Sequence, residues 1–333
     1  MKKVSVIGSG SWGTALAIML DNYGHDVTIW CRRESAAQAI IDDGENKEYL
    51  PGIEVRKSIT VTTDIEKAIG GADIIINAIP SKSIRSSMEK FAHLFNENQV
   101  IVNVSKGLEE STLMRISQVI KDCVPQCEVC TMVGPTHAEE VGKGVPSVCV
   151  IACENLETAK MIQEEFSNAT FRLYTNDDMI GTEMGAALKN IIALAAGMSD
   201  GLGFGDNTKA ALITRGLAEL CRLGIAMGGK LETFMGLSGV GDLVVTCTSM
   251  HSRNRRAGIL MGQGKTLAQT LDEIHMVVEG ANTAKAARLL AEKYNVDMPI
   301  LVAINKVLYE DKNAREAVME LMARDVKPEA NFI

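Results

Sequence analysis

The chain has 333 residues, of which 46% are hydrophobic and 23% are charged, with 34 basic and 42 acidic side chains and a formal net charge of −8. This composition is typical of a globular protein long enough for two domains with separate cores. The acidic balance argues against nucleic acid or an anionic membrane surface as the main partner. No apolar run reaches membrane-spanning length, and a strand is predicted within three residues of Met1. We therefore expect a cytoplasmic protein with no signal peptide and no stable membrane insertion.

A glycine-rich run at residues 8–13 lies between a short apolar strand and a stretch of good helix formers. This order of strand, turn and helix is the context that the dinucleotide-binding fingerprint requires. In that interpretation Gly8 forms the tight turn, Gly10 lets the backbone approach a pyrophosphate, and Gly13 lets the helix pack closely on its strand. The N–H groups at the helix start then face the phosphates. An ordinary strand-to-helix turn is the alternative, but a second strand at 26–30 favours a nucleotide site.

Arg32 and Arg33 follow this second strand. An acidic residue at that point would bond the ribose 2′-hydroxyl and favour NAD(H). Two guanidinium groups can instead hold a 2′-phosphate through paired hydrogen bonds. The sequence therefore favours NADP(H) and leaves NAD(H) open, while a solvated basic loop is the other interpretation of the same residues.

Strands and helices alternate through the first half of the chain. Further apolar strands are predicted at 59–62, 72–79, 100–104, 128–133, 147–152 and 171–174. Continuous apolar strands of this kind indicate a mostly parallel sheet covered on both faces. After Asp177 the pattern becomes helical, with stretches at 183–198, 208–226, 255–262, 267–273, 281–294, 299–309 and 313–324. We predict an α/β protein with a Rossmann-type dinucleotide-binding domain at 1–180 and an all-helical substrate-binding domain at 181–333.

Lys189 is the only formal charge in an apolar helical stretch at 184–197. A lysine whose stem lies on apolar surface while its ammonium reaches water is the common alternative. A partly desolvated lysine has a lowered pKa and can act as a general acid or base near neutrality. Asp242, in a glycine-rich turn, is positioned either to hold this ammonium or to cap a helix.

A hydroxyl, guanidinium and amide cluster at 252–256 lies in a predicted loop and suits a small phosphate. A solvated helix start and a nucleic-acid patch are the alternatives, and the acidic chain disfavours the second.

His137, in a glycine-proline turn, is a rival base, with an exposed or capping histidine as its alternative. Cys123, Cys127 and Cys130 complete no zinc pattern, so we expect reduced, mostly buried thiols and no metal.

Several runs of the chain together resemble one family, the bacterial NAD(P)-dependent glycerol-3-phosphate dehydrogenases. The matching runs lie in order at residues 8–17, 105–108, 134–141, 187–191, 241–247, 252–256 and 278–280. The resemblance implies interconversion of sn-glycerol 3-phosphate and dihydroxyacetone phosphate with NADP(H) or NAD(H), in support of glycerophospholipid synthesis. It also implies a Rossmann domain, a helical domain and a homodimer.

Carried over by motif, Lys189 resembles the proton acceptor in the oxidation direction, with Lys106 and Asp242 beside it in the catalytic set. The substrate contacts implied are Lys106, Gly134, Thr136, Lys189, Asp242, Ser252, Arg253 and Asn254. The cofactor contacts, including the fingerprint glycines, are Gly8, Gly10, Ser11, Trp12, Gly13, Arg32, Arg33, Lys106, Ala138, Arg253, Val277 and Glu279. Two positions depart from the family pattern: Thr136 stands where serine is frequent and Ala281 where valine is frequent.

Two other functions are open to the same residues. A β-hydroxyacid dehydrogenase also pairs a Rossmann domain with a helical domain and an essential lysine, but the cluster at 252–256 favours a phosphorylated substrate. A non-catalytic NAD(P)H sensor is the second, and in such a protein Lys189, Lys106 and Asp242 would have no chemical task.

Overall fold

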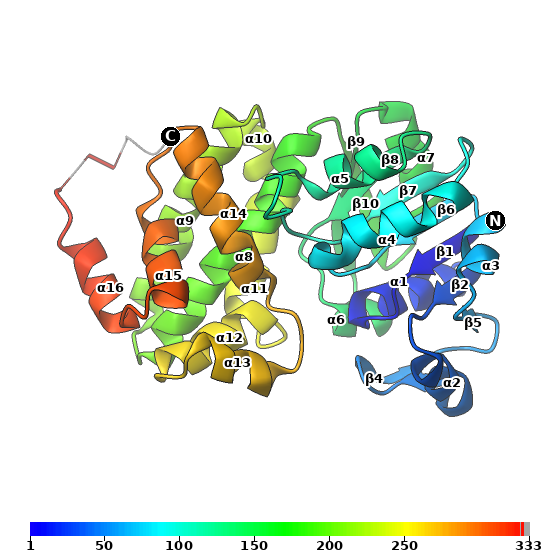
Figure 1. Cartoon of the computed structure of the whole chain (residues 1–333), viewed down its shortest axis with the longest axis horizontal. Coiled ribbons are helices and arrows are strands. Elements are labelled where there is room, and N and C mark those ends of the chain that lie inside the picture. The colour runs from blue at the N-terminus through cyan, green and yellow to red at the C-terminus, as the bar shows by residue number, and fades with distance from the viewer. Residues whose placement is uncertain (327, 330–333) are drawn as a thin grey trace. The chain divides into compact units, whose positions relative to one another are not determined.

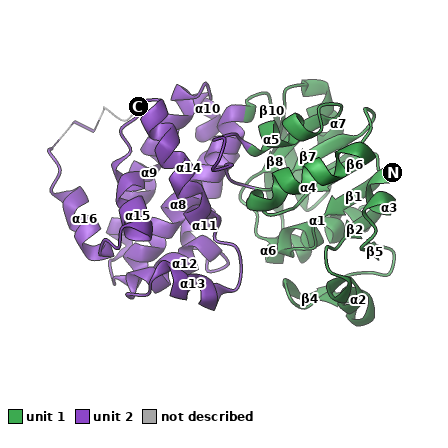
Figure 2. Cartoon of the chain, viewed as in Figure 1, with its two compact units in different colours: residues 1–105, 116–179 green, residues 106–115, 180–333 purple. Residues whose placement is uncertain are grey.

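The structure is a computed structural model of the chain that describes residues 1–326 and 328–329 (Figure 1). Its contacts divide into two compact units, residues 1–105 with 116–179 and residues 106–115 with 180–333 (Figure 2). Residues 327 and 330–333, the end of the predicted helical domain, lie outside the described residues.

The first unit is built on one eight-stranded sheet in the order β10-β9-β8-β7-β6-β1-β2-β5. Its strands are β1 (Lys3–Ile7), β2 (Asp26–Trp30), β5 (Thr60–Thr62), β6 (Ile74–Asn77), β7 (Val100–Asn103), β8 (Glu128–Val133), β9 (Ser147–Cys153) and β10 (Phe171–Asn176). All neighbouring pairs are parallel except β8 and β9, which are antiparallel. The mostly parallel sheet predicted from continuous apolar strands is confirmed.

Helices and a small hairpin complete the first unit. The helices are α1 (Ser11–Asn22), α2 (Glu34–Asp43), α3 (Ile65–Gly70), α4 (Ile84–Phe91), α5 (Ile116–Cys123), α6 (Ala138–Gly142) and α7 (Leu156–Phe166), with short 3₁₀ turns at 81–83 and 92–94. The hairpin pairs β3 (Glu45–Asn46) with β4 (Leu50–Glu54). We predicted only a loop around Pro51, because a two-residue strand leaves no alternation to read and proline is confined to edge strands.

The strand order reverses beside β1, which lies between β2 and β6. From β1 the chain builds β2 and β5 on one side, and it then crosses to build β6, β7 and β8 on the other. In open α/β sheets ligands bind at such a switch point, beyond the carboxyl ends of the strands. The ends of β1 and β6 are therefore the expected cofactor surface of this unit.

The second unit is helical, as predicted. Its helices are α8 (Met179–Gly201), α9 (Asp206–Ala226), α10 (Leu231–Phe234), α11 (Asp242–Thr248), α12 (Arg253–Gly262), α13 (Leu267–Ile274), α14 (Glu279–Lys293), α15 (Pro299–Tyr309) and α16 (Ala314–Met322). A π-helical turn, Leu237–Gly241, leads directly into α11. From Met179 to Ser199 every residue of α8 is buried except the half-buried Ile180, because its apolar side chains contact neighbouring helices on all sides.

Paired glycines let α12 cross α8 at very short range. A Cβ built on Gly197 would lie 2.9 Å from the Cα of Gly258, and one built on Gly201 would lie 3.0 Å from the Cα of Gly262. Larger side chains would push the two helices apart, so these glycines allow the close approach of α12 and α8.

A ten-residue excursion, residues 106–115, belongs to the second unit although it lies between β7 and α5 in the chain. Lys106 forms an ion pair with Asp242, Arg115 forms a 2.5 Å ion pair with Glu183 of α8, and Leu108 joins the apolar cluster of that unit. The predicted division at residue 180 did not include this excursion. What assigns these residues to the second unit is contact with partners far away in the sequence, and local composition does not reveal such contacts.

Within the described residues, no helix is both long enough and apolar enough to cross a membrane. All eight cysteines are free thiols, and all but Cys123 are buried. In the same part of the chain, no three His, Cys, Asp or Glu side chains are grouped so that they could hold a metal ion.

Candidate active site

The glycine-rich run forms the turn between β1 and α1. Gly8 has φ +121°, a conformation that L-residues with side chains rarely adopt, and its N–H donates to the carbonyl of Trp30 at 3.2 Å. A Cβ on Gly13 would lie 2.2 Å from the carbonyl oxygen of Gly8, so only glycine fits there. A Cβ on Gly10, in contrast, would meet no atom within 4 Å. Two of the glycines are therefore required by packing, and the third leaves open space.

The start of α1 has the features of an anion site. Gly10 is its N-cap residue, no side chain forms a capping hydrogen bond, and no acidic residue lies in the first turn. The next two residues, Ser11 and Trp12, are half-buried. The backbone N–H groups and the positive end of the helix dipole favour a phosphate here. These residues fit the pyrophosphate of a dinucleotide.

Arg32 and Arg33 lie where β2 ends, and both are exposed. Arg33 is the N-cap residue of α2, and its Nη2 donates to the two carboxylate oxygens of Glu48 at 2.7 and 2.5 Å. The contact raises the pKa of the guanidinium, mainly through this hydrogen bond. Glu48 was not predicted from the sequence, because it approaches from the β3–β4 hairpin.

Three predicted residues lie together beyond β8 in the first unit. Gly134 is buried, and a Cβ there would lie 2.8 Å from the carbonyl oxygen of Val148. Thr136 donates its hydroxyl to the carbonyl of Gly134 at 3.4 Å, and Ala138 is the first residue of α6. His137, the rival base, is the N-cap residue of α6.

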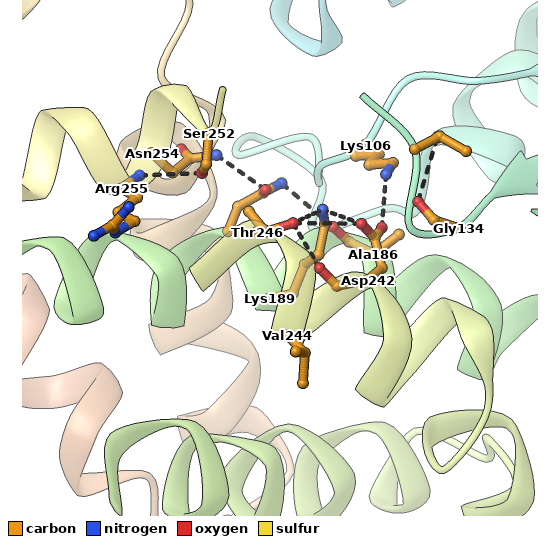
Figure 3. A network of polar contacts seen from close by, with 12 residues as sticks. Lys106, Gly134, Ala186, Lys189, Asp242, Val244, Thr246, Ser252, Asn254 and Arg255 are labelled. Carbon is orange, nitrogen blue, oxygen red and sulfur yellow. Dashed lines mark hydrogen bonds and ion pairs between the residues drawn. The ribbon is translucent and has the colours of Figure 1, made fainter. Parts of the chain in front are cut away.

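Two lysines converge on one carboxylate in the second unit (Figure 3). Lys189 Nζ lies 2.5 Å from Asp242 Oδ1, and Lys106 Nζ lies 2.6 Å from Asp242 Oδ2. Thr246 joins them, since its Oγ1 lies 2.5 Å from Lys189 Nζ and donates to the backbone carbonyl of Asp242 at 2.6 Å. We call these four residues the lysine–aspartate cluster. The structure thus brings together the three residues predicted as catalytic.

Burial controls the charge of this cluster. The side chains of Lys189 and Asp242 are only 5% and 2% exposed, and that of Lys106 is 17% exposed. Burial lowers the pKa of Lys189 to about 7; the Asp242 carboxylate opposes this shift, and the Lys106 ammonium adds to it. An amine that titrates near neutrality can both donate and accept a proton at physiological pH.

Asp242 reaches the cluster because it opens a helix. The prediction of a flexible glycine turn was incomplete here: the glycines form the π-helical turn, and Asp242 begins α11. On α11, Asp242 and Thr246 are four residues apart and therefore share a face. Thr246 was not predicted, because a helix at Asp242 was only the alternative interpretation of this stretch; the four-residue spacing was the available signal.

The cluster at 252–256, predicted as a loop with a helix start as the alternative, is the start of a helix. Ser252 is the N-cap of α12, and its hydroxyl accepts from the N–H of Arg255 at 3.2 Å. Arg255 is held by Asp200, with its Nη2 and Nε both 2.8 Å from the carboxylate. Arg253, the first helical residue, is half-buried. The two arginines therefore differ. Arg255 links α12 to Asp200 of α8 through an ion pair, whereas Arg253 is the first residue of α12.

Asn254 connects the beginnings of two helices to α8. Its Nδ2 donates to Asn190 Oδ1 at 3.0 Å, and its Oδ1 accepts from the N–H of Gly280 at 2.8 Å. Asn190 directly follows Lys189, and Gly280 directly follows Glu279 in the first turn of α14. Val277, two residues before Glu279, is exposed. The Asn254 amide thus links the first turns of α12 and α14 to α8, the helix that carries Lys189.

A parallel sheet with a glycine fingerprint at its switch point, in a chain that also carries a buried lysine titrating near neutrality, defines a nicotinamide-dependent oxidoreductase. Comparison with known proteins gives the family. A model of the N-terminus of NAD-dependent glycerol-3-phosphate dehydrogenase matches residues 3–159, and one of its C-terminus matches residues 178–319. The chain belongs to the NAD(P)-dependent glycerol-3-phosphate dehydrogenase family.

Individual members of the family are similar to this chain over nearly their whole length. The glycerol-3-phosphate dehydrogenase [NAD(P)+] of Fusobacterium nucleatum is 53% identical over 331 residues, which is 99% of each chain. That of Agathobacter rectalis is 54% identical and covers 99% of this chain and 98% of its own. The crystal structure of the Coxiella burnetii glycerol-3-phosphate dehydrogenase superimposes with a TM-score of 0.93 at 35% identity, covering 97% of this chain and 99% of that one.

The family membership decides between the functions that the sequence left open. The protein is an oxidoreductase that interconverts sn-glycerol 3-phosphate and dihydroxyacetone phosphate with NAD(P)(H). It is therefore neither a β-hydroxyacid dehydrogenase nor a non-catalytic sensor.

Proposed function

We propose that Lys189 is the general acid and base of this reaction and that the lysine–aspartate cluster holds the reacting end of the substrate. The observation that carries the proposal is the geometry of that cluster, with Lys189 and Lys106 on one buried carboxylate. Two ammonium groups against one carboxylate leave a net positive charge when Lys189 is protonated. A charge of this sign stabilises an oxygen that becomes negative during reduction.

The chemistry follows from the charge states. When bound, the reduced nicotinamide supplies a hydride to C2 of dihydroxyacetone phosphate. Lys189 donates its proton to the oxygen on C2 as negative charge develops there, and in the oxidation direction its neutral amine accepts that proton. Asp242 and Thr246 hold the Lys189 nitrogen in place, and Lys106 adds positive field.

The phosphate of the substrate is assigned to the start of α12. Ser252, Arg253 and Asn254 open this ten-residue helix, whose N–H groups and dipole favour an anion. Arg253 adds a guanidinium suited to phosphate oxygens. Binding the non-reacting phosphate positions C2 for hydride transfer. Gly134 and Thr136 complete the proposed substrate contacts.

The proposed cofactor contacts begin at the glycine-rich turn of the first unit. The turn at Gly8, Gly10 and Gly13 and the start of α1 take the pyrophosphate, and Arg32 and Arg33 take the adenosine ribose end. The remaining proposed contacts are Ser11, Trp12, Lys106, Ala138, Arg253, Val277 and Glu279.

We further propose a cytoplasmic homodimer that supplies glycerol 3-phosphate for glycerophospholipid synthesis. A measurement of its mass in solution tests the dimer.

The test is a pH–rate profile in both directions, with dihydroxyacetone phosphate and with glycerol 3-phosphate. Because the pKa of Lys189 is about 7, reduction should fall and oxidation should rise as the pH increases through about 7. Asp242→Asn removes the carboxylate that raises this pKa, so its profile should move to lower pH. A substrate phosphate that titrates in the same range would leave the profile unmoved in this variant, and that result would remove Lys189 from the role.

A further inference from the structure

The β3–β4 hairpin is fastened to the glycine-rich turn. Asn46 is 3% exposed, and its Nδ2 donates to the carbonyl of Ser9 at 2.9 Å and to the hydroxyl of Thr14 at 2.8 Å. The N–H of Tyr49 in turn approaches Asn46 Oδ1 at 3.3 Å. One buried amide therefore determines where the hairpin lies relative to the start of α1.

With the hairpin held in this position, the carboxylate of Glu48 lies beside Arg33, just beyond the end of β2. Glu48 accepts from Arg33 Nη2 on both oxygens, and the neighbouring Tyr49 hydroxyl also acts on its charge. The Tyr49 hydroxyl, with a smaller contribution from Arg33, lowers the pKa of Glu48, so this side chain is ionised at neutral pH. The charges of Arg32 and Arg33 both act on Tyr49, which places the two arginines and the hairpin in one electrostatic environment.

In dinucleotide-binding folds an acidic residue at the end of this strand selects the ribose 2′-hydroxyl of NAD(H), and an arginine there accommodates the 2′-phosphate of NADP(H). The chain has arginines at the strand end, which alone would favour NADP(H). The hairpin adds the acidic residue from a different place in the sequence. Glu48 occupies one nitrogen of Arg33 that a 2′-phosphate would use, and its own charge repels that phosphate.

We propose that Glu48 is a specificity-determining residue that shifts the cofactor preference of this enzyme from NADP(H) toward NAD(H). The inference rests on the proposed placement of the adenosine ribose beside Arg32 and Arg33. Since Arg33 and Glu48 are about half exposed, at 49% and 51%, the pair opens at modest cost and both cofactors remain substrates.

The experiment measures kcat/KM for NADPH and NADH in Glu48→Gln. The glutamine keeps the shape of the side chain and removes the charge, so the NADPH-to-NADH ratio should rise about 3- to 10-fold, through a lower KM for NADPH. Adenosine 2′,5′-bisphosphate, which carries the 2′-phosphate without a nicotinamide, should inhibit the variant more strongly by a similar factor. Both changes should shrink at high ionic strength.

Asp43→Asn is the matched control. It removes one negative charge from an exposed ion pair at the end of α2, where Asp43 lies 2.9 Å from Lys47, without touching Arg33. Its cofactor ratio should stay at the wild-type value. An equal rise in this control would show a general charge effect and overturn the role of Glu48.

Arg33→Gln separates this inference from the placement on which it rests. We expect it to lower kcat/KM for NADPH more than for NADH. If it does so while Glu48→Gln leaves the ratio unchanged, the ribose placement holds and the Glu48 proposal is wrong. If neither variant changes the ratio, the ribose end binds elsewhere and both fail.

Discussion

The two units carry their charged groups in different surroundings. In the first unit, Arg33 and Glu48 form an ion pair whose side chains are about half exposed. In the second, Lys189 and Asp242 form one at almost complete burial. Exposed pairs contribute little to stability and rearrange easily, whereas burial shifts the pKa of a charged group by several units.

This difference matches two different tasks. A surface that must admit and release a large cofactor is served by backbone N–H groups and by exposed side chains that can move. A group that transfers a proton is served by a buried position, because desolvation moves its pKa toward neutrality. The proposed cofactor surface of the first unit and the proposed proton-transfer group of the second unit each lie in surroundings that suit their task.

The largest expected effect is on the buried lysine. Lys189→Ala should reduce turnover by roughly 10²–10⁴, the usual contribution of a positioned acid–base group. Cofactor affinity should stay near the wild-type value, as measured by quenching of protein fluorescence or by calorimetry. Lys160→Ala, which removes an exposed lysine of α7, is the control and should keep full turnover. Turnover of Lys189→Ala within a few-fold of wild type would contradict the assignment.

The fingerprint glycines give a smaller and more selective prediction. Gly10→Ala places a methyl group where no protein atom lies within 4 Å, so the fold should persist. The methyl would displace the pyrophosphate from the N–H groups of α1, and KM for NADH and NADPH should rise about 10- to 100-fold. Gly13→Ala should instead lower the thermal unfolding midpoint, because its Cβ would overlap the Gly8 carbonyl. Equal loss of stability in both variants would contradict the separation of their roles.

The smallest expected effect concerns a buried carboxylate outside the proposed site. Glu219 of α9 accepts from the N–H groups of Ile300 and Leu301 at 2.7 and 3.1 Å, at the start of α15. Burial raises its pKa to about 7, with the two backbone hydrogen bonds opposing the shift. The folded state thus keeps a proton that the unfolded chain loses near its ordinary pKa of about 4.5. Stability should therefore fall as the pH rises from about 4.5 to about 7, by about 1–3 kcal/mol, and level off above.

Urea unfolding at pH 5.5 and pH 8 measures this effect. Glu219→Gln carries no titrating proton, so its stability should fall less, or rise more, from pH 5.5 to pH 8 than that of wild type. Glu157→Gln, at a side chain that is 79% exposed, should keep the wild-type difference. An unchanged difference in Glu219→Gln would show that Glu219 does not titrate in this range.

Much of the fold follows from local pattern. The strand at β1, the glycine turn and the helix α1 are contiguous, and each is recognisable from its own residues. The long helices of the second unit are similarly marked by runs of Ala, Leu, Ile and Met. The short elements were missed: β3 and β4 are too brief to show alternation, and α11 was concealed by the glycines that precede it.

The candidate site divides in the same way. Lys189 was identifiable as a lone charge in an apolar helix, and the family motifs named Asp242 and Lys106 as neighbours. Glu48 had no such signal, since it contributes through the partner that the fold brings to it, and Thr246 was marked only by its four-residue spacing from Asp242. The start of α12 was predicted as a loop, with a helix start as the alternative and a helix from residue 255, because its polar and charged residues suit both.

By itself the amino-acid sequence determined the order of the longer helices and strands, the dinucleotide fingerprint and the lone buried lysine that we propose as general acid and base, because these depend on neighbours within a few residues. Tertiary structure alone decided that Lys189 meets a carboxylate 53 positions away and that this carboxylate also holds a lysine 136 positions distant. The pKa of Lys189 depends on that assembly, since desolvation and the charges of Asp242 and Lys106 arise only when distant segments pack together.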